Sequence, residues 1–200
     1  MNFSACAKLR LTPLTGVWYR CIPPRFWKSS LQTRQTSKVH SRFNAGPLAK
    51  PKFEILYLCE NPALALEEVE AQFYTRAGQI VANPAQSWLV MNVRVQLQSV
   101  ADLTSVAAQE ILETNPQELT GDWQGYQTRG PHSSVTDPVG VSPTQHLGQA
   151  LLSVASLEAF QTVSAKRSDH RSLVVFPQKL LADSSLQFVN PISNKVHTIP

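Results

Sequence analysis

The sequence predicts an α+β fold with a mainly antiparallel central sheet and flanking helices. Within the predicted strand 87–98, residues 91–98 alternate strictly between apolar and polar side chains, which indicates a long strand with one solvated face and favours antiparallel pairing. The predicted strands outnumber the helices and do not alternate regularly with them, as in α+β proteins. With 200 residues, 42% of them hydrophobic, the chain can bury a single core. We therefore expect one domain over residues 16–200 after a loosely held lead-in, residues 1–15.

The N-terminal part combines strands with a basic loop. Residues 16–22 are rich in β-branched and aromatic side chains and lie between a glycine and two prolines, which predicts a strand. Residues 25–40 are polar and basic with little periodicity, so a loop is expected. A turn with Gly and Pro follows at residues 43–47, and residues 54–59 predict a short strand.

Arg20 takes a notable position within the first strand. Strand alternation places it on the same face as Trp18 and Ile22, opposite Tyr19. The guanidinium could reach solvent along its aliphatic stem. Alternatively, it could be held ready for an anion, because its planar fork matches pairs of phosphate oxygens. The strand pattern leaves both interpretations open.

A helix is expected to begin directly after the second strand. Asn61 is a good N-cap and Pro62 suits the first helical position, and the pattern continues to about Arg76. Its apolar stripe consists of Leu66, Val69 and Phe73. From the helix pattern alone, Glu67 and Glu68 are more readily explained as solvated charges than as catalysts.

The C-terminal half contains shorter elements around one long loop. Residues 120–143 are rich in Gly, Pro, Ser and Thr and include Trp123 and Tyr126. Loops of this length in compact domains are usually functional or mobile. The other predicted elements are helices at 105–112, from 115 and at 143–155, and strands at 160–163, 173–176, 186–190 and 195–199.

Charge and cysteine content narrow the class of protein. The net charge is +4 and the pI is about 9.1. Residues 8–52 contain no acid, so this segment forms either a solvated basic surface or a region that steers an anionic ligand. Cys6, Cys21 and Cys59 are too few and too scattered for a disulfide framework or a zinc site. Cys21 and Cys59 lie in apolar runs, so these two are expected to be buried thiols.

Several common functional signatures are absent from the sequence. It contains no Gly-x-Gly-x-x-Gly or Walker loop, no Gly-x-Ser-x-Gly elbow and no His-Glu-x-x-His pair. Its five histidines are scattered, so no metal cofactor is expected. No apolar run approaches the length of about 20 residues that a membrane span needs. The thiols and the lack of a signal-peptide pattern fit a cytoplasmic protein.

Four segments, in this order along the chain, resemble the RES domain family, which is named for its arginine, glutamate and serine. They are Trp18-Tyr19-Arg20; Ser41-Arg42-Phe43-Asn44; Leu56-Tyr57-Leu58 with residues 65–69; and residues 144–148 with 163–167 and 173–177. Two departures occur: Ser41 replaces the usual glycine, and Val163 replaces the proline that often precedes the serine. Glu67 and Glu68 compete for the glutamate position, and we choose Glu68 because it directly precedes Val69.

The resemblance implies an ADP-ribosyltransferase-like fold and an enzyme that degrades NAD. Family members cleave the nicotinamide–ribose bond by phosphorolysis or hydrolysis. Many are toxins blocked by an Xre-type antitoxin. For this chain it implies NAD phosphorolysis, giving nicotinamide and ADP-ribose 1''-phosphate, with phosphate as co-substrate and no cofactor. The implied catalytic residues are Arg20, Glu68 and Ser164, and the implied substrate-binding residues are Arg42, Tyr57, Tyr19 and Asn44.

The implied chemistry agrees with the residue types. Breaking a nicotinamide–ribose bond passes through an oxocarbenium-like state, which a carboxylate stabilises. Nicotinamide leaves as a neutral molecule, so neither a metal nor a general acid is required. Two rival hypotheses remain: an inactive RES-like binding module, and a basic nucleic-acid-binding domain, although direct nucleic-acid binding is not expected. The sequence also leaves open hydrolysis and assembly into a homo-oligomer.

Overall fold

The computed structural model describes residues 1–74, 79–83, 87–128, 140–190 and 194–199. Within them the strands form a large mixed sheet in the order β1-β2-β7-β6-β5-β8-β9. The strands of this sheet are β1 (Leu11–Ile22), β2 (Leu56–Cys59), β5 (Leu89–Asp102), β6 (Ala159–Val163), β7 (Arg171–Val175), β8 (Ser185–Val189) and β9 (Val196–Ile199). The mixed α+β class predicted from the sequence is confirmed.

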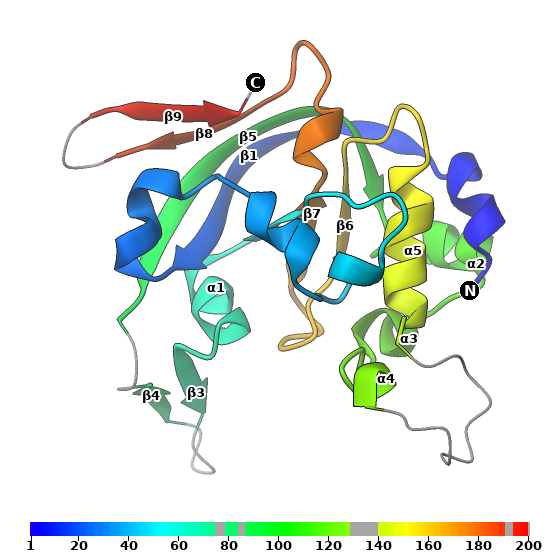
Figure 1. The fold of residues 1–200 in the computed structure, drawn as a ribbon, viewed down its shortest axis with the longest axis horizontal. Helices are drawn as coiled ribbons and strands as arrows, with labels where there is room; N and C mark the ends of the chain where they lie inside the picture. Colours follow the sequence, from blue (N-terminus) through cyan, green and yellow to red (C-terminus); the bar gives the residue numbers. More distant parts are fainter. Residues whose placement is uncertain (75–78, 84–86, 129–139, 191–193, 200) are drawn as a thin grey trace.

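The sheet closes on itself because β1 pairs with β5 as well as with β2. Strands β1, β2, β7, β6 and β5 thus form a barrel-like ring, and β8 and β9 extend from β5 (Figure 1). All of these pairings are antiparallel except β5 with β6, which run parallel. Closure protects the edges that an open sheet would expose.

The long β5 strand confirms the predicted alternation. Met91, Val93, Val95 and Leu97 are buried, whereas the polar residues between them are exposed. Strand β1 is longer than expected and starts at Leu11, because residues 11–14 also pair with β5 across a register shift. Pro13 lies at this shift, where a missing N–H interrupts no regular ladder.

Apolar side chains pack on both faces of the sheet. Inside the ring lie Leu58, Val93 and Leu173, which come from three different strands. The outer face packs Phe160 and Val174 against helices. These are α2 (Val106–Leu112), α3 (Pro116–Thr120), α5 (Pro143–Leu152) and the 3₁₀ segment η1 (Phe3–Lys8). The inner cluster fills the ring, and the outer face carries loops and helices.

The N-terminal residues differ from the loose lead-in expected for residues 1–15. In η1, Ala5 and Cys6 are buried in the outer core, and Leu9 joins them. Figure 1 shows η1 next to α2 and α5. Cys21 and Cys59 are free and buried, as predicted, and Cys6 is also free and buried.

The basic segment 25–40, expected to be a loop, contains two 3₁₀ helices, η2 (Pro24–Ser29) and η3 (Arg34–Lys38). The predicted turn at 43–47 leads into a third, η4 (Gly46–Leu48). Two further short helices are α4 (Gly125–Thr128) and η5 (Pro177–Lys179).

The first α-helix is shorter than predicted. Asn61 caps α1 (Pro62–Glu68), as expected, but the helix ends at Glu68 rather than near Arg76. Glu70 adopts a left-handed φ of 57°, and the N–H groups of Glu70 and Ala71 bond back to Glu67 and Leu66. This is the Schellman geometry, which usually uses glycine. The chain then forms the hairpin β3 (Gln72–Tyr74) with β4 (Ile80–Ala82). Arg76 itself lies outside the described residues.

Candidate active site

The loop 41–44 is fixed in the interior by Asn44. Its side-chain amide donates to the carbonyls of Phe53 (3.0 Å) and Thr36 (3.2 Å), and its Oδ1 accepts from the Gly46 N–H (2.8 Å). Asn44 is fully buried. The structure therefore places this predicted substrate-binding residue beneath the loop, where it supports the backbone, and not in a cavity.

Helix α5 holds the same loop from the other side. A capping box at Ser142 starts the helix, and the Gln145 amide donates to the Ser41 carbonyl at 2.9 Å. At Gly148 the helix approaches so closely that a Cβ would lie 1.9 Å from the Phe43 carbonyl oxygen. Only glycine permits this contact. The loop is thereby clamped with the Arg42 side chain projecting from it.

A cavity of about 440 Å³ opens where loop 41–43, β2, α1 and the end of β6 meet. Three predicted site residues line it: Arg42, Tyr57 and Glu68. They come from the loop, the strand and the helix that follow one another between residues 41 and 69. The structure thus brings an arginine, a tyrosine and a carboxylate around one hollow.

Ser164 lies directly behind the carboxylate. Its hydroxyl donates to Glu68 Oε1 at 2.6 Å and accepts from the N–H groups of Lys166 (3.1 Å) and Arg167 (3.2 Å). Ser164 is buried and does not line the cavity. The resemblance implied that this serine is a catalytic residue, but its observed bonds indicate that it orients Glu68.

The two competing glutamates have different surroundings. Glu68 faces the cavity, whereas Glu67 is buried and lies 3.6 Å from the Arg167 guanidinium. Successive helical residues point about 100° apart, so the two carboxylates cannot share one environment. This geometry supports the choice of Glu68.

Arg42 and Tyr57 have pKa values shifted mainly by burial. Burial lowers the pKa of Arg42, while the charges of Glu68, Tyr57 and Asp122 act in the opposite direction. Burial raises the pKa of Tyr57 to about 12. At neutral pH the guanidinium is therefore charged and the phenol is protonated. The Tyr57 hydroxyl accepts from the Phe43 N–H at 3.1 Å and lies 3.0 Å from Ser41 Oγ.

Arg20 and Tyr19 are not among the residues that line this cavity. Arg20 lies on the face of β1 that carries Trp18 and Ile22, and its Nη1 donates to the Ser30 carbonyl at 2.7 Å. Burial lowers its pKa to about 10. Tyr19 lies on the opposite face and packs against α1 with Cys59. The sequence showed that strand alternation places Arg20 and Tyr19 on opposite faces of β1. It did not show which of these faces would lie toward the site.

The cavity also contains residues that the sequence did not single out as functional. Thr162 and Ser172 are neighbours on β6 and β7, and Trp123 and Lys166 come from loops. The Thr162 hydroxyl is buried without a hydrogen-bond partner among the described residues. Thr162 and Ser172 are polar residues on the strand faces that also carry the buried Phe160 and Val174, and this break in an apolar face is the signal that could have identified them.

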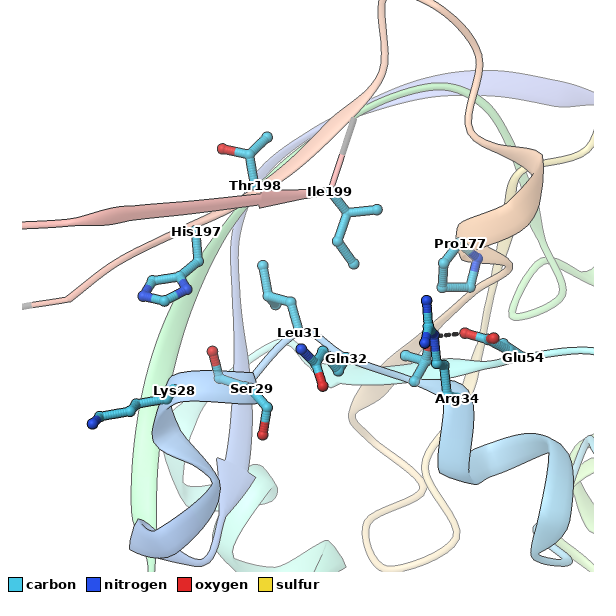
Figure 2. Close-up of a pocket in the computed structure, with 12 residues that line it drawn as sticks. Lys28, Ser29, Leu31, Gln32, Arg34, Glu54, Pro177, His197, Thr198 and Ile199 are labelled. Carbon is cyan, nitrogen blue, oxygen red and sulfur yellow. Dashed lines mark hydrogen bonds between the residues drawn. The ribbon is translucent and has the colours of Figure 1, made fainter.

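Another hollow, of about 420 Å³, lies on a different part of the molecule between η2–η3 and β9. Figure 2 shows Lys28 and His197 at one side of it, with Arg34 and Glu54 at the other. Glu54 accepts a hydrogen bond from the Thr33 hydroxyl at 2.6 Å. None of the predicted site residues lines it, so it is not the candidate active site.

Neither a metal cluster nor a membrane helix emerges from the ranges that the structure describes. These ranges contain no group of three or more His, Cys, Asp or Glu side chains arranged to hold a metal ion. Within the same ranges, none of the helices has the length and apolar character needed to cross a bilayer.

Comparison with known proteins gives one family and one fold. The family model described as RES domain matches residues 17–190. A solved structure from M. tuberculosis, of the MbcT–MbcA toxin–antitoxin complex, contains a chain that superposes with a TM-score of 0.66 at 18% identity. The superposition covers 94% of this chain and 88% of that one. At this identity the likeness concerns the fold alone. No match was found among curated proteins.

Proposed function

Because the chain belongs to the RES domain family, we propose that it degrades NAD by cleaving the nicotinamide–ribose bond, with phosphate as acceptor, and that it acts as the toxin of a toxin–antitoxin pair. One observation carries the enzymatic part of the proposal. The Glu68 carboxylate is fixed by the Ser164 hydroxyl at 2.6 Å in a cavity that also contains Arg42 and the protonated Tyr57.

Glu68 supplies the main electrostatic stabilisation in this reaction. The bond between ribose C1' and the nicotinamide nitrogen breaks, and its electron pair neutralises the pyridinium. Positive charge then develops on the ribose, and a carboxylate at this position stabilises it. Ser164 acts as a positioning residue, since its hydroxyl contacts Glu68 rather than the cavity.

Cations near the cavity suit the anionic parts of the reactants. Arg42 and Lys166 line it, and the Lys166 ammonium lies 3.0 Å from Glu70. A guanidinium binds phosphate oxygens in pairs. We assign the pyrophosphate to Arg42. We assign the incoming phosphate, whose oxygen forms the new bond to C1', to the space near Lys166. Tyr57 offers its ring and hydroxyl to the nicotinamide riboside.

Arg20 has an indirect role in this proposal. Its guanidinium is held by the Ser30 carbonyl and does not line the cavity. We therefore assign to Arg20 the support of the η2 region rather than contact with substrate, which leaves Arg42 as the anion-binding arginine.

The toxin role has a separate basis. A chain of a toxin–antitoxin complex shares the fold over most of both lengths. For this chain we expect an Xre-type antitoxin as partner. Co-expression with the product of a neighbouring helix-turn-helix gene should relieve growth inhibition by the wild-type protein. Equal growth inhibition with and without every such neighbour would contradict the toxin–antitoxin pairing.

The enzymatic proposal is tested by incubating purified protein with NAD, with and without inorganic phosphate. Nicotinamide release and the mass of the ADP-ribose product are measured together. We expect nicotinamide in both incubations, faster with phosphate, and ADP-ribose 1''-phosphate only when phosphate is present. ADP-ribose alone in both would indicate hydrolysis. The absence of nicotinamide in both would indicate an inactive binding module.

A further inference from the structure

A hollow different from the one in Figure 2, called the second hollow from here on, adjoins the candidate active site at Trp123. It has a volume of about 310 Å³, at the lower end of the range for small-molecule pockets. Its walls come from the 118–126 segment and from the start of α5, residues 142–144. Trp123 lines this hollow and also the cavity that contains Glu68. One indole therefore forms the wall between the two spaces.

Arg42 connects the same two spaces. Its side chain lines the cavity with Glu68, and its Nη1 donates to the Gly121 carbonyl at 2.6 Å. Gly121 belongs to the second hollow. The charges of both Glu68 and Asp122 act on Arg42. The guanidinium thus lies at the junction, where a bridging anion would meet it.

The residues of the second hollow suit a nucleoside. Trp123 and Tyr126 offer aromatic faces on which a base can stack. Asp122 and Glu118 supply carboxylates, and a carboxylate commonly accepts from a ribose hydroxyl in dinucleotide sites. One oxygen of Asp122 is fixed by the N–H groups of Gln124 (3.0 Å) and Gly125 (3.1 Å). A phosphate would be repelled by these acids, which confines it to Arg42.

We propose that the hollow lined by Trp123, Tyr126 and Asp122 holds the adenosine half of the substrate, so that the two spaces together bind one dinucleotide. This inference rests on the proposed function for the identity of the other half. The nicotinamide riboside lies beside Glu68, the pyrophosphate at Arg42 and the adenosine beyond Trp123. Trp123 and Tyr126, which the sequence had left without a role, thereby acquire one.

The test compares NAD with nicotinamide mononucleotide, which lacks the adenosine half. Tyr126→Ala removes a ring that lines the second hollow but not the cavity that contains Glu68. We expect its KM for NAD to rise about tenfold, as loss of one stacked base contact implies, with kcat unchanged. Its KM for nicotinamide mononucleotide should equal that of the wild type. Tyr126→Phe, which keeps the ring, and His197→Ala, in the hollow of Figure 2, are the matched controls.

A titration with adenosine monophosphate provides a readout that does not depend on turnover. Binding should be about tenfold weaker in Tyr126→Ala than in the wild type and in both controls. If the wild type consumes NAD but Tyr126→Ala changes the two KM values equally or not at all, the adenosine assignment is wrong while the proposed reaction stands. If the wild type leaves NAD intact, the proposed reaction fails. In that case, adenosine monophosphate binding that does not depend on Tyr126 would also overturn the adenosine assignment.

Discussion

Replacing Glu68 with glutamine tests the carboxylate with the least change in shape. The variant keeps the length and volume of the side chain, and its amide oxygen can still accept the Ser164 proton that Oε1 now accepts at 2.6 Å. Only the negative charge beside the developing ribose cation is lost. Removing one such preorganised contact costs about 3–4 kcal/mol in the transition state. We therefore expect kcat to fall by about 100–1000-fold.

Glu67→Gln is the matched control, one position away on the same helix. Glu67 is buried against Arg167 and does not line the cavity. Its replacement should lower the free energy of unfolding, because Arg167 loses a charged partner. We expect its kcat to remain within a few-fold of the wild-type value.

The assay is initial-rate nicotinamide release at saturating NAD and phosphate, with urea denaturation of both variants to confirm folding. Wild-type turnover by folded Glu68→Gln would refute the role of the carboxylate. A similar loss of kcat in the two variants would refute the distinction between the glutamates.

Three further predictions concern packing and protonation. Gly148→Ala should lower the free energy of unfolding by about 1–3 kcal/mol, because its Cβ would lie 1.9 Å from the Phe43 carbonyl oxygen; urea denaturation measures this, and an unchanged midpoint would contradict the close packing. Burial raises the pKa of Tyr57 to about 12, so its contribution is complete below pH 10 and is lost as the pH rises from about 10 to about 12. Wild-type stability should fall by about 2–3 kcal/mol more than that of Tyr57→Phe over this interval, and parallel curves would disprove the shift. Burial, followed by the charge of Glu68, raises the pKa of Cys59 to about 12. At pH 8 its alkylation by iodoacetamide should therefore be at least about 100-fold slower than that of free cysteine, whereas a comparable rate would show an accessible thiolate.

Local patterns predicted most of the secondary structure. Strict alternation identified β5, and polar caps before proline located the starts of α1 and α3 at Asn61 and Asn115. These signals depend on residues adjacent in sequence. The end of α1 escaped because Glu70 takes a conformation that glycine usually adopts. The start of β1 escaped because its pairing with β5 joins residues about 90 positions apart in the chain.

Distance along the sequence also determined which parts of the site could be predicted. Arg42, Tyr57 and Glu68 lie on consecutive elements, and their meeting followed from the family resemblance and short connections. The orientation of Arg20 depends on which face of β1 the barrel encloses, and this is decided by the whole ring. The role of Ser164 depends on a bond to Glu68 that spans 96 positions. Neither could be derived from neighbouring residues.

The bonds made by Ser164 have a consequence for control of the protein. Two backbone amides and one carboxylate already meet at its hydroxyl. The Glu68 carboxylate is thus oriented before any reactant arrives, which lowers the entropic cost of ordering this side chain on binding. Under the proposed function, an enzyme whose carboxylate is already oriented would not be regulated by completing its active site. Regulation in the cell would instead act by blocking the entrance to the cavity or by limiting the supply of substrate.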